Sequence, residues 1–289
     1  MQNKNCFIGV DLGGTKIYSA RFEDGKIVAV SLDKTPSKGS KEILFEALEN
    51  SIRSVWSDDV GGIGIGVPSV VDRKEGIVYN VVHIPGLDVF PLAELIGNSF
   101  SRPVYVDNDA NCFALGERVM GVGKNYENFV GLTLGTGLGG GIIQNGRLLQ
   151  DRNCGSGEFG MLPYQDNVLE YYCSGSFFKN VYGVDGREMN KRAQDGDQEA
   201  LEAYQQLGKH VAAAVKMVVF TVDPEMIVFG GSLAKSYVLF EKSMYEYLND
   251  FPYPRSIERL RIFFSDAKVS AVVGAAALCP DFVKMNLRR

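Results

Sequence analysis

The feature that most constrains the fold is a pattern of apolar strand, glycine turn and second strand that occurs once in each half of the chain. The first copy is 7–15 (FIGVDLGGT) and the second is 129–137 (FVGLTLGTG). A hairpin-type turn follows each copy, Asp24-Gly25 in the first and Asn145-Gly146 in the second. Internal repetition indicates two related halves that fold alike. A chance likeness between two common glycine turns is the alternative at this stage.

Strand and helix patterns alternate along the rest of the 289-residue chain. Runs rich in β-branched residues predict strands, and apolar residues at helical spacing predict helices. This alternation predicts an α/β fold, and the length fits two domains. The predicted strands, beyond those that open each copy, are 16–22, 26–31, 62–71, 104–107 and 226–229, and the predicted helices are 43–56, about 110–119, 201–222 and 269–278.

Glycine is abundant, with 33 residues in a chain of 289, against an average share of roughly 7%. Glycine lets several backbone N–H groups approach one phosphate, because no Cβ stands in the way. Three glycine segments are candidates for phosphate binding. Asp11, just before the first, is the hard oxygen ligand that Mg²⁺ and its waters prefer. The alternative is a set of tight turns without a ligand. The segments are Gly13-Gly14-Thr15-Lys16, Thr136-Gly137 and Gly230-Gly231.

Polar residues 107–111 (DNDAN) stand between a predicted strand and a predicted helix. Capping of the helix by one of these side chains is the structural alternative. The functional interpretation makes Asp109 a general base that takes a proton from a substrate hydroxyl, with Asn108 beside it. Glu158 and Glu170 lie in a turn-rich stretch and could hold sugar hydroxyls, whereas solvated surface acids are the alternative.

Charge and cysteine content exclude several classes of protein. The net charge of −5 argues against nucleic acid or an anionic membrane as partner. Neither a signal-peptide pattern nor an apolar run long enough for a membrane span is visible. The five cysteines are widely spaced, which argues against a disulfide framework or a zinc site. We interpret His83 and His210 as structural. The sequence therefore predicts a cytoplasmic protein with reduced thiols.

Eight motifs occur in an order that resembles the ROK family of sugar kinases and sugar-responsive repressors, within the actin/hexokinase-like ATPase fold. This resemblance implies two duplicated α/β domains with mixed sheets and a cleft between them. The N-terminal lobe would comprise 1–112 plus about 270–289, and the C-terminal lobe about 113–269. The motifs are 11–16 (DLGGTK), 66–68 (GVP), 84–86 (IPG), 108–111 (NDAN), 134–141 (LGTGLGGG), 157–160 (GEFG), 169–170 (LE) and 230–232 (GGS).

The resemblance also implies an activity, namely ATP-dependent phosphorylation of a hexose or N-acetylhexosamine, usually at the 6-hydroxyl. The matching positions make Asp109 the catalytic base and also a sugar contact. They place Mg²⁺ near Asp11, through water, and leave room for a homodimer. A catalytically weak sugar- or nucleotide-binding protein, a regulator without a DNA-binding domain and a polyphosphate-dependent kinase are the alternatives. The other positions carried over are Asn108, Glu158 and Glu170 for the sugar, Gly13, Gly14, Thr15, Lys16, Thr136 and Gly137 for phosphate, and Gly230 and Gly231 for the adenosine side.

One segment departs from the family pattern. Family members carry a histidine three residues after the glutamate of the Gly-Glu motif, where this chain has Met161. A cysteine-rich zinc loop then precedes the second glutamate, whereas here Phe159 to Leu169 contain neither cysteine nor histidine. We therefore expect no zinc, and a less polar sugar site near Met161.

Overall fold

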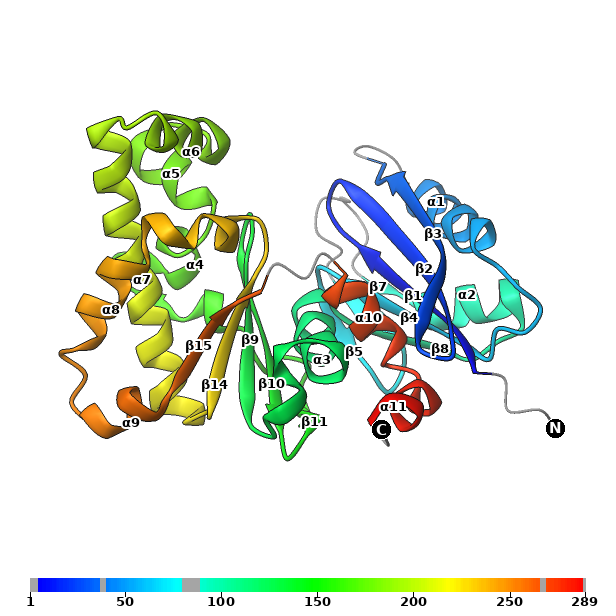
Figure 1. Cartoon of the computed structure of the whole chain (residues 1–289). Helices are drawn as coiled ribbons and strands as arrows, with labels where there is room; N and C mark the ends of the chain where they lie inside the picture. Colours follow the sequence, from blue (N-terminus) through cyan, green and yellow to red (C-terminus); the bar gives the residue numbers. More distant parts are fainter. Residues whose placement is uncertain (1–4, 37–39, 80–88, 266–268, 288–289) are drawn as a thin grey trace. The chain divides into compact units, whose positions relative to one another are not determined.

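The computed structural model describes residues 5–36, 40–79, 89–265 and 269–287. His83 and the 84–86 motif therefore lie outside the described residues. The chain folds into two compact units (Figure 1). The first comprises Met1–Lys124, Leu148–Ser156 and Lys268–Arg289, and the second comprises Asn125–Arg147 and Gly157–Ala267.

A five-stranded mixed sheet forms the centre of the first unit, in the order β3-β2-β1-β4-β8. Strand β1 pairs antiparallel with β2 and parallel with β4, and β4 pairs parallel with β8. Asp24 and Gly25 join β2 to β3 with φ of 49° and 78°, the left-handed conformation that a tight hairpin turn requires. The strands are β1 (Cys6–Leu12), β2 (Lys16–Glu23), β3 (Lys26–Lys34), β4 (Gly62–Val67) and β8 (Val104–Asn108).

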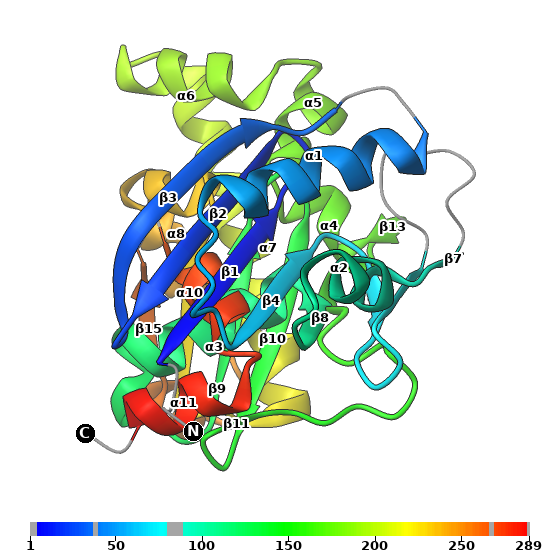
Figure 2. The same cartoon turned by 90° about the vertical axis from the view of Figure 1, so that its right-hand side faces the viewer.

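Helices cover both faces of this sheet, and each face has its own core. Ile8 and Val10 of β1 share one core with Leu44 and Leu48 of α1. Figure 2 shows α1 lying across this face. Side chains on the other face of the sheet, such as Phe7 of β1, pack in the second core. The helices are α1 (Lys41–Ser54) and α2 (Leu92–Phe100) on the first face, and α3 (Asp109–Met120), α10 (Ser270–Ala276) and α11 (Pro280–Leu287) on the second.

Part of the glycine excess has a packing cause. A Cβ at Gly64 of β4 would lie 1.7 Å from the carbonyl oxygen of Ala275 in α10. A Cβ at Gly274 of α10 would lie 1.6 Å from the carbonyl oxygen of Cys112 in α3. Helix α10 therefore fits against both the sheet and α3 only where side chains are missing.

A small antiparallel sheet, β5-β6-β7, also belongs to the first unit. The predicted strand 62–71 is in fact two strands, β4 and β5, with a bend at Pro68-Ser69. The turn between β5 and β6 is tight, because the Asp72 side chain accepts from the backbone N–H groups of Lys74 and Glu75, each at 3.0 Å. The strands are β5 (Val70–Asp72), β6 (Ile77–Tyr79) and β7 (Val89–Phe90).

The sheet of the second unit repeats the first. Its order is β11-β10-β9-β14-β15, with β9 antiparallel to β10 and parallel to β14, and β14 parallel to β15. Asn145 and Gly146 repeat the left-handed hairpin turn, with φ of 52° and 71°. The predicted duplication is confirmed. The strands are β9 (Phe129–Leu134), β10 (Leu138–Gln144), β11 (Arg147–Leu148), β14 (Met226–Gly230) and β15 (Arg261–Phe264).

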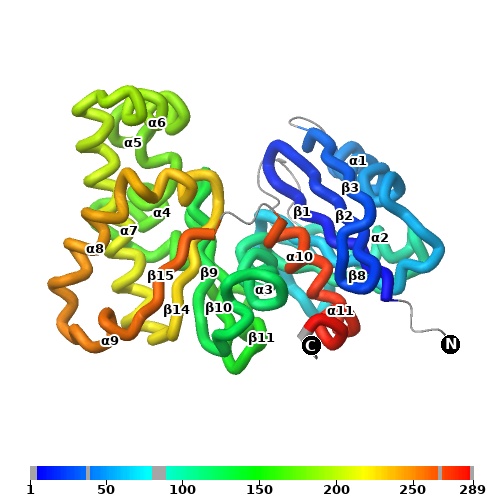
Figure 3. Tube along the Cα trace, viewed as in Figure 1, coloured from blue at the N-terminus to red at the C-terminus, as the bar shows by residue number. Residues whose placement is uncertain are grey.

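The longest helix described in the second unit is α7 (Gln198–Val222), and Figure 3 traces it alongside α8. The Asp197 side chain caps its start by accepting from the N–H of Ala200 at 3.0 Å. The helix ends at Val222, and its C-cap, Asp223, has a φ of 47° and precedes Pro224. The other elements are β12 (Pro163–Tyr164), β13 (Asn167–Val168), α4 (Leu169–Tyr172), α5 (Ser176–Tyr182), α6 (Gly186–Gln194), α8 (Glu241–Leu248), α9 (Pro254–Arg259) and the 3₁₀ turns η1 (Val122–Asn125), η2 (Phe159–Met161) and η3 (Leu233–Leu239).

The division between the units differs from the predicted lobe boundary at residue 112, which falls inside α3. The whole of α3 belongs to the first unit because it packs closely against α10. The segment Leu148–Ser156 also returns to the first unit. In the described part of the chain, no helix is both long and apolar enough to cross a membrane.

Candidate functional site

The junction between β8 and α3 carries Asp109, the predicted general base. Asn108 is the N-cap of α3, and its Oδ1 accepts from the N–H groups of Ala110 at 2.8 Å and Asn111 at 3.4 Å. Asp109 is the first residue of the helix, and its Oδ1 accepts from the N–H of Ala110 at 2.9 Å. A carboxylate at this end of a helix is stabilised by the free N–H groups and the helix dipole. Capping of α3 and a functional role for Asp109 are therefore compatible, because Asn108 provides the cap and Asp109 is the following residue.

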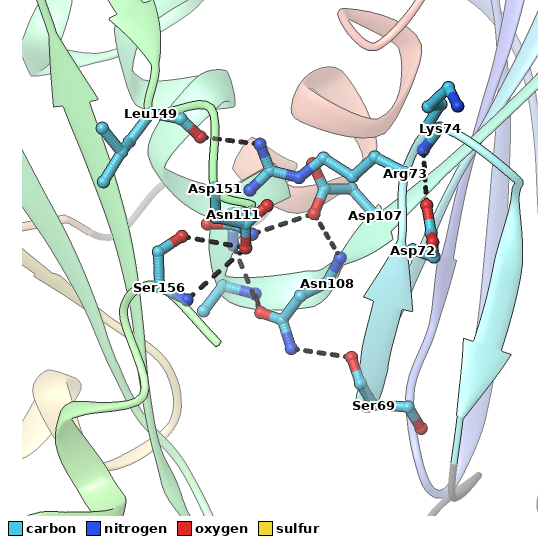
Figure 4. A network of polar contacts seen from close by, with 11 residues as sticks. Ser69, Asp72, Arg73, Lys74, Asp107, Asn108, Asn111, Leu149, Asp151 and Ser156 are labelled. Carbon is cyan, nitrogen blue, oxygen red and sulfur yellow. Dashed lines mark hydrogen bonds and ion pairs between the residues drawn. The ribbon is translucent and has the colours of Figure 1, made fainter. Parts of the chain in front are cut away.

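Asp107, just before the cap, is the centre of a buried polar network (Figure 4). Its side chain is almost fully buried. Its Oδ1 accepts from the N–H of Asn108 at 2.7 Å and from Nδ2 of Asn111 at 2.8 Å. Its Oδ2 lies 2.8 Å from Nε of Arg73. Burial raises the pKa of Asp107, and the charge of Arg73 opposes this rise.

The Arg73 contact could not be predicted from the local sequence, because the two residues come from distant segments. Arg73 lies in the turn between β5 and β6. Besides facing Asp107, its Nη1 donates to the carbonyl oxygen of Leu149 at 2.7 Å. Figure 4 shows the guanidinium between these two partners.

The Asp11 loop joins β1 to β2 at the same edge of the sheet. Asp11, Gly66 and Asp107 are register partners across β1, β4 and β8. These three strands are parallel, so their carboxyl ends lie together, where ligands of α/β sheets usually bind. Asp11 is half-buried, and burial raises its pKa to about 6.

The loop itself is held by its own backbone and by Thr35. The N–H of Gly13 donates to the carbonyl oxygen of Lys16 at 2.8 Å. Thr35 donates through Oγ1 to the carbonyl oxygen of Gly13 at 2.6 Å, and through its N–H to that of Thr15 at 3.1 Å. Gly14, Thr15 and Lys16 are exposed, so their polar groups are accessible to a ligand.

The corresponding loop of the second unit contains Thr136 and Gly137, between β9 and β10. Oε2 of Glu170 accepts from the N–H of Leu138 at 2.8 Å. Ser176 donates through Oγ to the carbonyl oxygen of Thr136 at 2.7 Å. Glu170, which the sequence predicts as a sugar ligand, is thus also part of the support of this loop.

Glu158 lies close enough to Glu170 for their charges to interact. The pKa of Glu158 is raised, first by desolvation and then by the charge of Glu170. Gly157, just before it, has a φ of 85°, and a Cβ there would meet the carbonyl oxygen of Gly140 at 2.2 Å. Met161 is 59% exposed on η2. The two predicted sugar-binding carboxylates are therefore close enough to interact, and the exposed apolar side chain of Met161 lies between them in sequence.

Gly230 and Gly231 follow at the carboxyl end of β14. Gly231 has a φ of 93°, and a Cβ there would lie 2.4 Å from the carbonyl oxygen of Leu134. This position requires glycine on both counts. The predicted site residues thus form two groups: Asp11, Gly13, Gly14, Thr15, Lys16, Asn108 and Asp109 in the first unit, and Thr136, Gly137, Glu158, Glu170, Gly230 and Gly231 in the second.

A sequence model of the ROK family matches residues 7–281, which is nearly the whole chain. The chain belongs to the ROK family. The resemblance drawn from the motifs is therefore confirmed at the level of the family.

Two relatives and one solved structure place this ROK protein among sugar-kinase homologues. It is 27% identical to a glucokinase of Thermotoga maritima, over 95% of this chain and 97% of the relative. It is 31% identical to an N-acetyl-D-glucosamine kinase of Pasteurella multocida, over 81% and 86%. A ROK family glucokinase from Streptomyces griseus, solved with glucose and AMPPNP, is 26% identical and superposes with a TM-score of 0.81 over 96% of this chain and 99% of that one. The predicted duplicated α/β fold is confirmed by this likeness.

Proposed function

We propose that this ROK protein is an ATP-dependent sugar kinase that transfers the γ-phosphoryl group of MgATP to a hydroxyl of a hexose or N-acetylhexosamine, the 6-hydroxyl in particular. The observation that carries the proposal is the position of Asp109. This carboxylate stands at the first turn of α3, at the same sheet edge as the Asp11 loop. The similarity to glucokinases and to an N-acetyl-D-glucosamine kinase supports it.

In this proposal Asp109 accepts the proton of the attacking hydroxyl. Phosphoryl transfer depends mainly on positioning and charge, so a base fixed at a helix start suits the reaction. Asn108 uses Oδ1 for the cap and one Nδ2 hydrogen for the carbonyl oxygen of Ser69 at 3.2 Å. Its second Nδ2 hydrogen is then the donor for a sugar hydroxyl.

The phosphates would be bound by the loops at the ends of β1 and β9. Gly13, Gly14 and Thr15 supply backbone N–H groups, and Lys16 a positive charge. Thr136 and Gly137 form the loop after β9, while Gly230 and Gly231 are assigned to the adenosine side. Each loop is braced by hydrogen bonds from outside it, by Thr35 in the first unit and by Ser176 in the second. Braced loops reduce the entropy that ATP binding costs.

Asp11 fits a magnesium ion. Mg²⁺ is usually held by one or two carboxylates together with waters and substrate phosphates rather than by an all-protein cage. Asp11 is a half-buried carboxylate at the carboxyl end of β1, and we assign it to Mg²⁺, most simply through water. When bound there with the phosphates, Mg²⁺ offsets the charge of the transferred group.

Glu158 and Glu170 would accept hydrogen bonds from neighbouring sugar hydroxyls. Paired acids suit a polyol, because each hydroxyl donates one hydrogen bond. Met161 places an apolar side chain where family members have a histidine. The sugar substituent next to it can therefore be apolar, such as the methyl of an N-acetyl group or a CH₂ of a deoxy sugar, as well as a hydroxyl. A panel of hexoses and N-acetylhexosamines with MgATP, read by ADP release, identifies the substrate.

Asp109→Asn tests the mechanism. The change keeps the size of the side chain and removes the base, so we expect ADP release to fall by about 10²- to 10⁴-fold. Sugar binding, measured by calorimetry, should be retained. Asp281→Asn is the matched control, because Asp281 is an exposed acid in the first turn of another helix of the same unit. An unchanged rate in Asp109→Asn would refute the assignment.

If the wild-type chain binds sugars but never releases ADP, the proposed kinase function is wrong and the chain is a sugar-binding protein. If the chain phosphorylates a sugar with polyphosphate but not with ATP, it is a sugar kinase whose phosphoryl donor is polyphosphate. The same panel separates these outcomes when it is run with both donors and read by formation of the sugar phosphate, because transfer from polyphosphate releases no ADP.

A further inference from the structure

Arg73 joins three segments of the first unit around the start of α3. It stands in the tight β5–β6 turn, whose backbone the Asp72 side chain holds. Nε faces Oδ2 of Asp107 at 2.8 Å, and Nη1 donates to the carbonyl oxygen of Leu149 at 2.7 Å. Its anchor is thus a hairpin turn, and its contacts lie on a strand end and on the returning segment Leu148–Ser156.

Asp107 in turn contacts residues on both sides of Asp109, the backbone of one and the side chain of the other. One oxygen, Oδ1, accepts from the N–H of Asn108 and from the side chain of Asn111. The first contact fixes the residue before Asp109, and the second fixes a residue in the first helical turn after it. Displacement of Asp107 would therefore release the N–H of Asn108 and the side chain of Asn111, the residues that flank Asp109 in the cap and first turn of α3.

We propose that Arg73 and Asp107 form a positioning pair for Asp109: they hold the proposed base at the distance and angle that phosphoryl transfer needs, without touching the sugar. This inference rests on the proposed kinase function. A misplacement of about 1 Å in a reacting group costs about 100-fold in rate, so such a pair would act on kcat rather than on sugar affinity.

Burial makes the pair interdependent. Asp107 is 2% exposed and Arg73 23% exposed in their side chains. Removal of one partner leaves the other buried without its counter-charge, which is much more costly than removal of both. The pair therefore predicts a non-additive double substitution. Two independent structural residues would give additive effects.

The experiment compares Arg73→Gln, Asp107→Asn and the double variant with a matched control. Arg102→Gln is the control, since Arg102 is also a partly buried arginine of the first unit that donates to backbone carbonyls, those of Val60 at 2.5 Å and Asp58 at 2.9 Å. We expect kcat of Arg73→Gln to fall about 10- to 100-fold, with the sugar KM within about threefold of wild type. Arg102→Gln should keep kcat within about twofold.

The double variant decides whether the two residues act together. We expect its kcat to be at least about fivefold above that of Arg73→Gln, because the neutral amide that replaces the Asp107 carboxylate no longer needs a counter-charge. If Arg73→Gln does not fold, Arg73→Lys carries the test, with an expected fall in kcat of about three- to tenfold at unchanged KM, since it keeps the charge and loses the planar fork.

Additive losses, a loss in KM alone, or a kcat no lower than that of Arg102→Gln would each overturn the positioning pair. Asp109→Asn is measured in the same assay. An active wild type, an inactive Asp109→Asn and an unchanged Arg73→Gln would overturn only this inference. A wild type that phosphorylates no sugar with either donor would overturn the proposed function and the inference with it.

Discussion

At the scale of single residues, the loop after β9 shows how tightly one carboxylate and one glycine are matched. A Cβ on Gly137 would lie 2.3 Å from Oε2 of Glu170, the oxygen that accepts from the N–H of Leu138. A side chain at this position and the Glu170 hydrogen bond therefore exclude one another. Gly135, two residues earlier, has no atom within 4 Å of such a Cβ.

Gly137→Ala should therefore push the Glu170 carboxylate off the loop. The lost hydrogen bond to a charged acceptor is worth about 1.5–3 kcal/mol, so we expect kcat/KM for the sugar to fall by about tenfold or more. Steady-state kinetics checks this. Gly135→Ala is the control and should stay close to wild type. Equal kinetics in the two variants would contradict the match between Gly137 and Glu170.

At the scale of elements, the sequence predicted those helices and strands whose formation depends on residues close together in the chain. The strands of both copies and helices α1, α3, α7 and α10 lie close to their predicted positions, since apolar periodicity and turn residues specify them. The elements that were not predicted are helices α2, α4, α5, α6, α8, α9 and α11, strands β6, β7, β11 and β15, and the β12–β13 hairpin. The Arg73–Asp107 contact was missed for a related reason: it depends on packing between segments that are distant in sequence, and nothing near Arg73 marks it as the partner of the polar segment 107–111.

The crossing of α3 and α10 gives a prediction at this scale. Gly274→Ala would place a Cβ 1.6 Å from the carbonyl oxygen of Cys112, a backbone atom that cannot move aside alone. We expect a loss of about 3 kcal/mol in unfolding free energy. Fluorescence of the single tryptophan, Trp56, reports urea unfolding of the first unit, because Trp56 lies in that unit. Its ring centroid is 4.9 Å from that of Phe100.

Gly97→Ala in α2 is the matched control. Its Cβ would have the carbonyl oxygen of Arg102 at 3.5 Å as nearest neighbour, an ordinary contact. Alanine should then stabilise the helix by about 0.5–1 kcal/mol. Destabilisation of similar size in both variants would show that the close crossing is not what requires glycine at position 274.

The contact between α7 and the β12–β13 hairpin predicts a pH dependence. Nδ1 of His210 lies 3.0 Å from the Tyr164 hydroxyl. Burial, and secondarily Lys209, lowers the pKa of His210 to about 4, from an ordinary value of 6.5. The unfolded chain therefore takes up a proton at a pH where the folded chain does not, and stability is lost as the pH falls from about 6.5 toward 4.

Because His210 is only partly buried, we expect about 1–2 kcal/mol of this loss. His210→Gln keeps a hydrogen-bonding side chain and does not titrate. The difference in unfolding free energy between wild type and His210→Gln, followed by far-ultraviolet circular dichroism, should change over this pH range. Parallel pH profiles would show that His210 does not titrate differently on folding.

At the scale of the whole molecule, the two sheets share one strand order, and the two loops after their equivalent strands β1 and β9 both carry predicted phosphate-binding residues. Asp11 and the loop after it follow β1, and Thr136 and Gly137 follow β9. Repetition was visible in the sequence because each copy depends on a contiguous strand–turn–strand segment. The compact units keep α3 whole because it packs against α10, a long-range contact that a predicted lobe boundary at residue 112 does not take into account.

The chemistry of the thiols leads to a prediction about zinc. Cys6, Cys112, Cys173 and Cys279 are buried and belong to different elements or turns. Burial raises the pKa of Cys112, Cys173 and Cys279, and burial of this kind is typical of inert structural thiols. Among the residues that the structure describes, no three histidine, cysteine or acidic side chains are grouped as metal ligands.

We therefore expect removal of zinc to change neither stability nor activity. The chain is dialysed against EDTA and returned to Mg²⁺, and its unfolding midpoint and ADP release are compared with those of untreated protein. A structural zinc site contributes about 10–16 kcal/mol, so its loss would unfold the chain outright. A stoichiometric amount of zinc by elemental analysis, with a lower midpoint after chelation, would contradict the prediction. Without added Mg²⁺ the chain should stay folded and release no ADP, because in the proposed mechanism Mg²⁺ acts on the phosphates rather than on the fold.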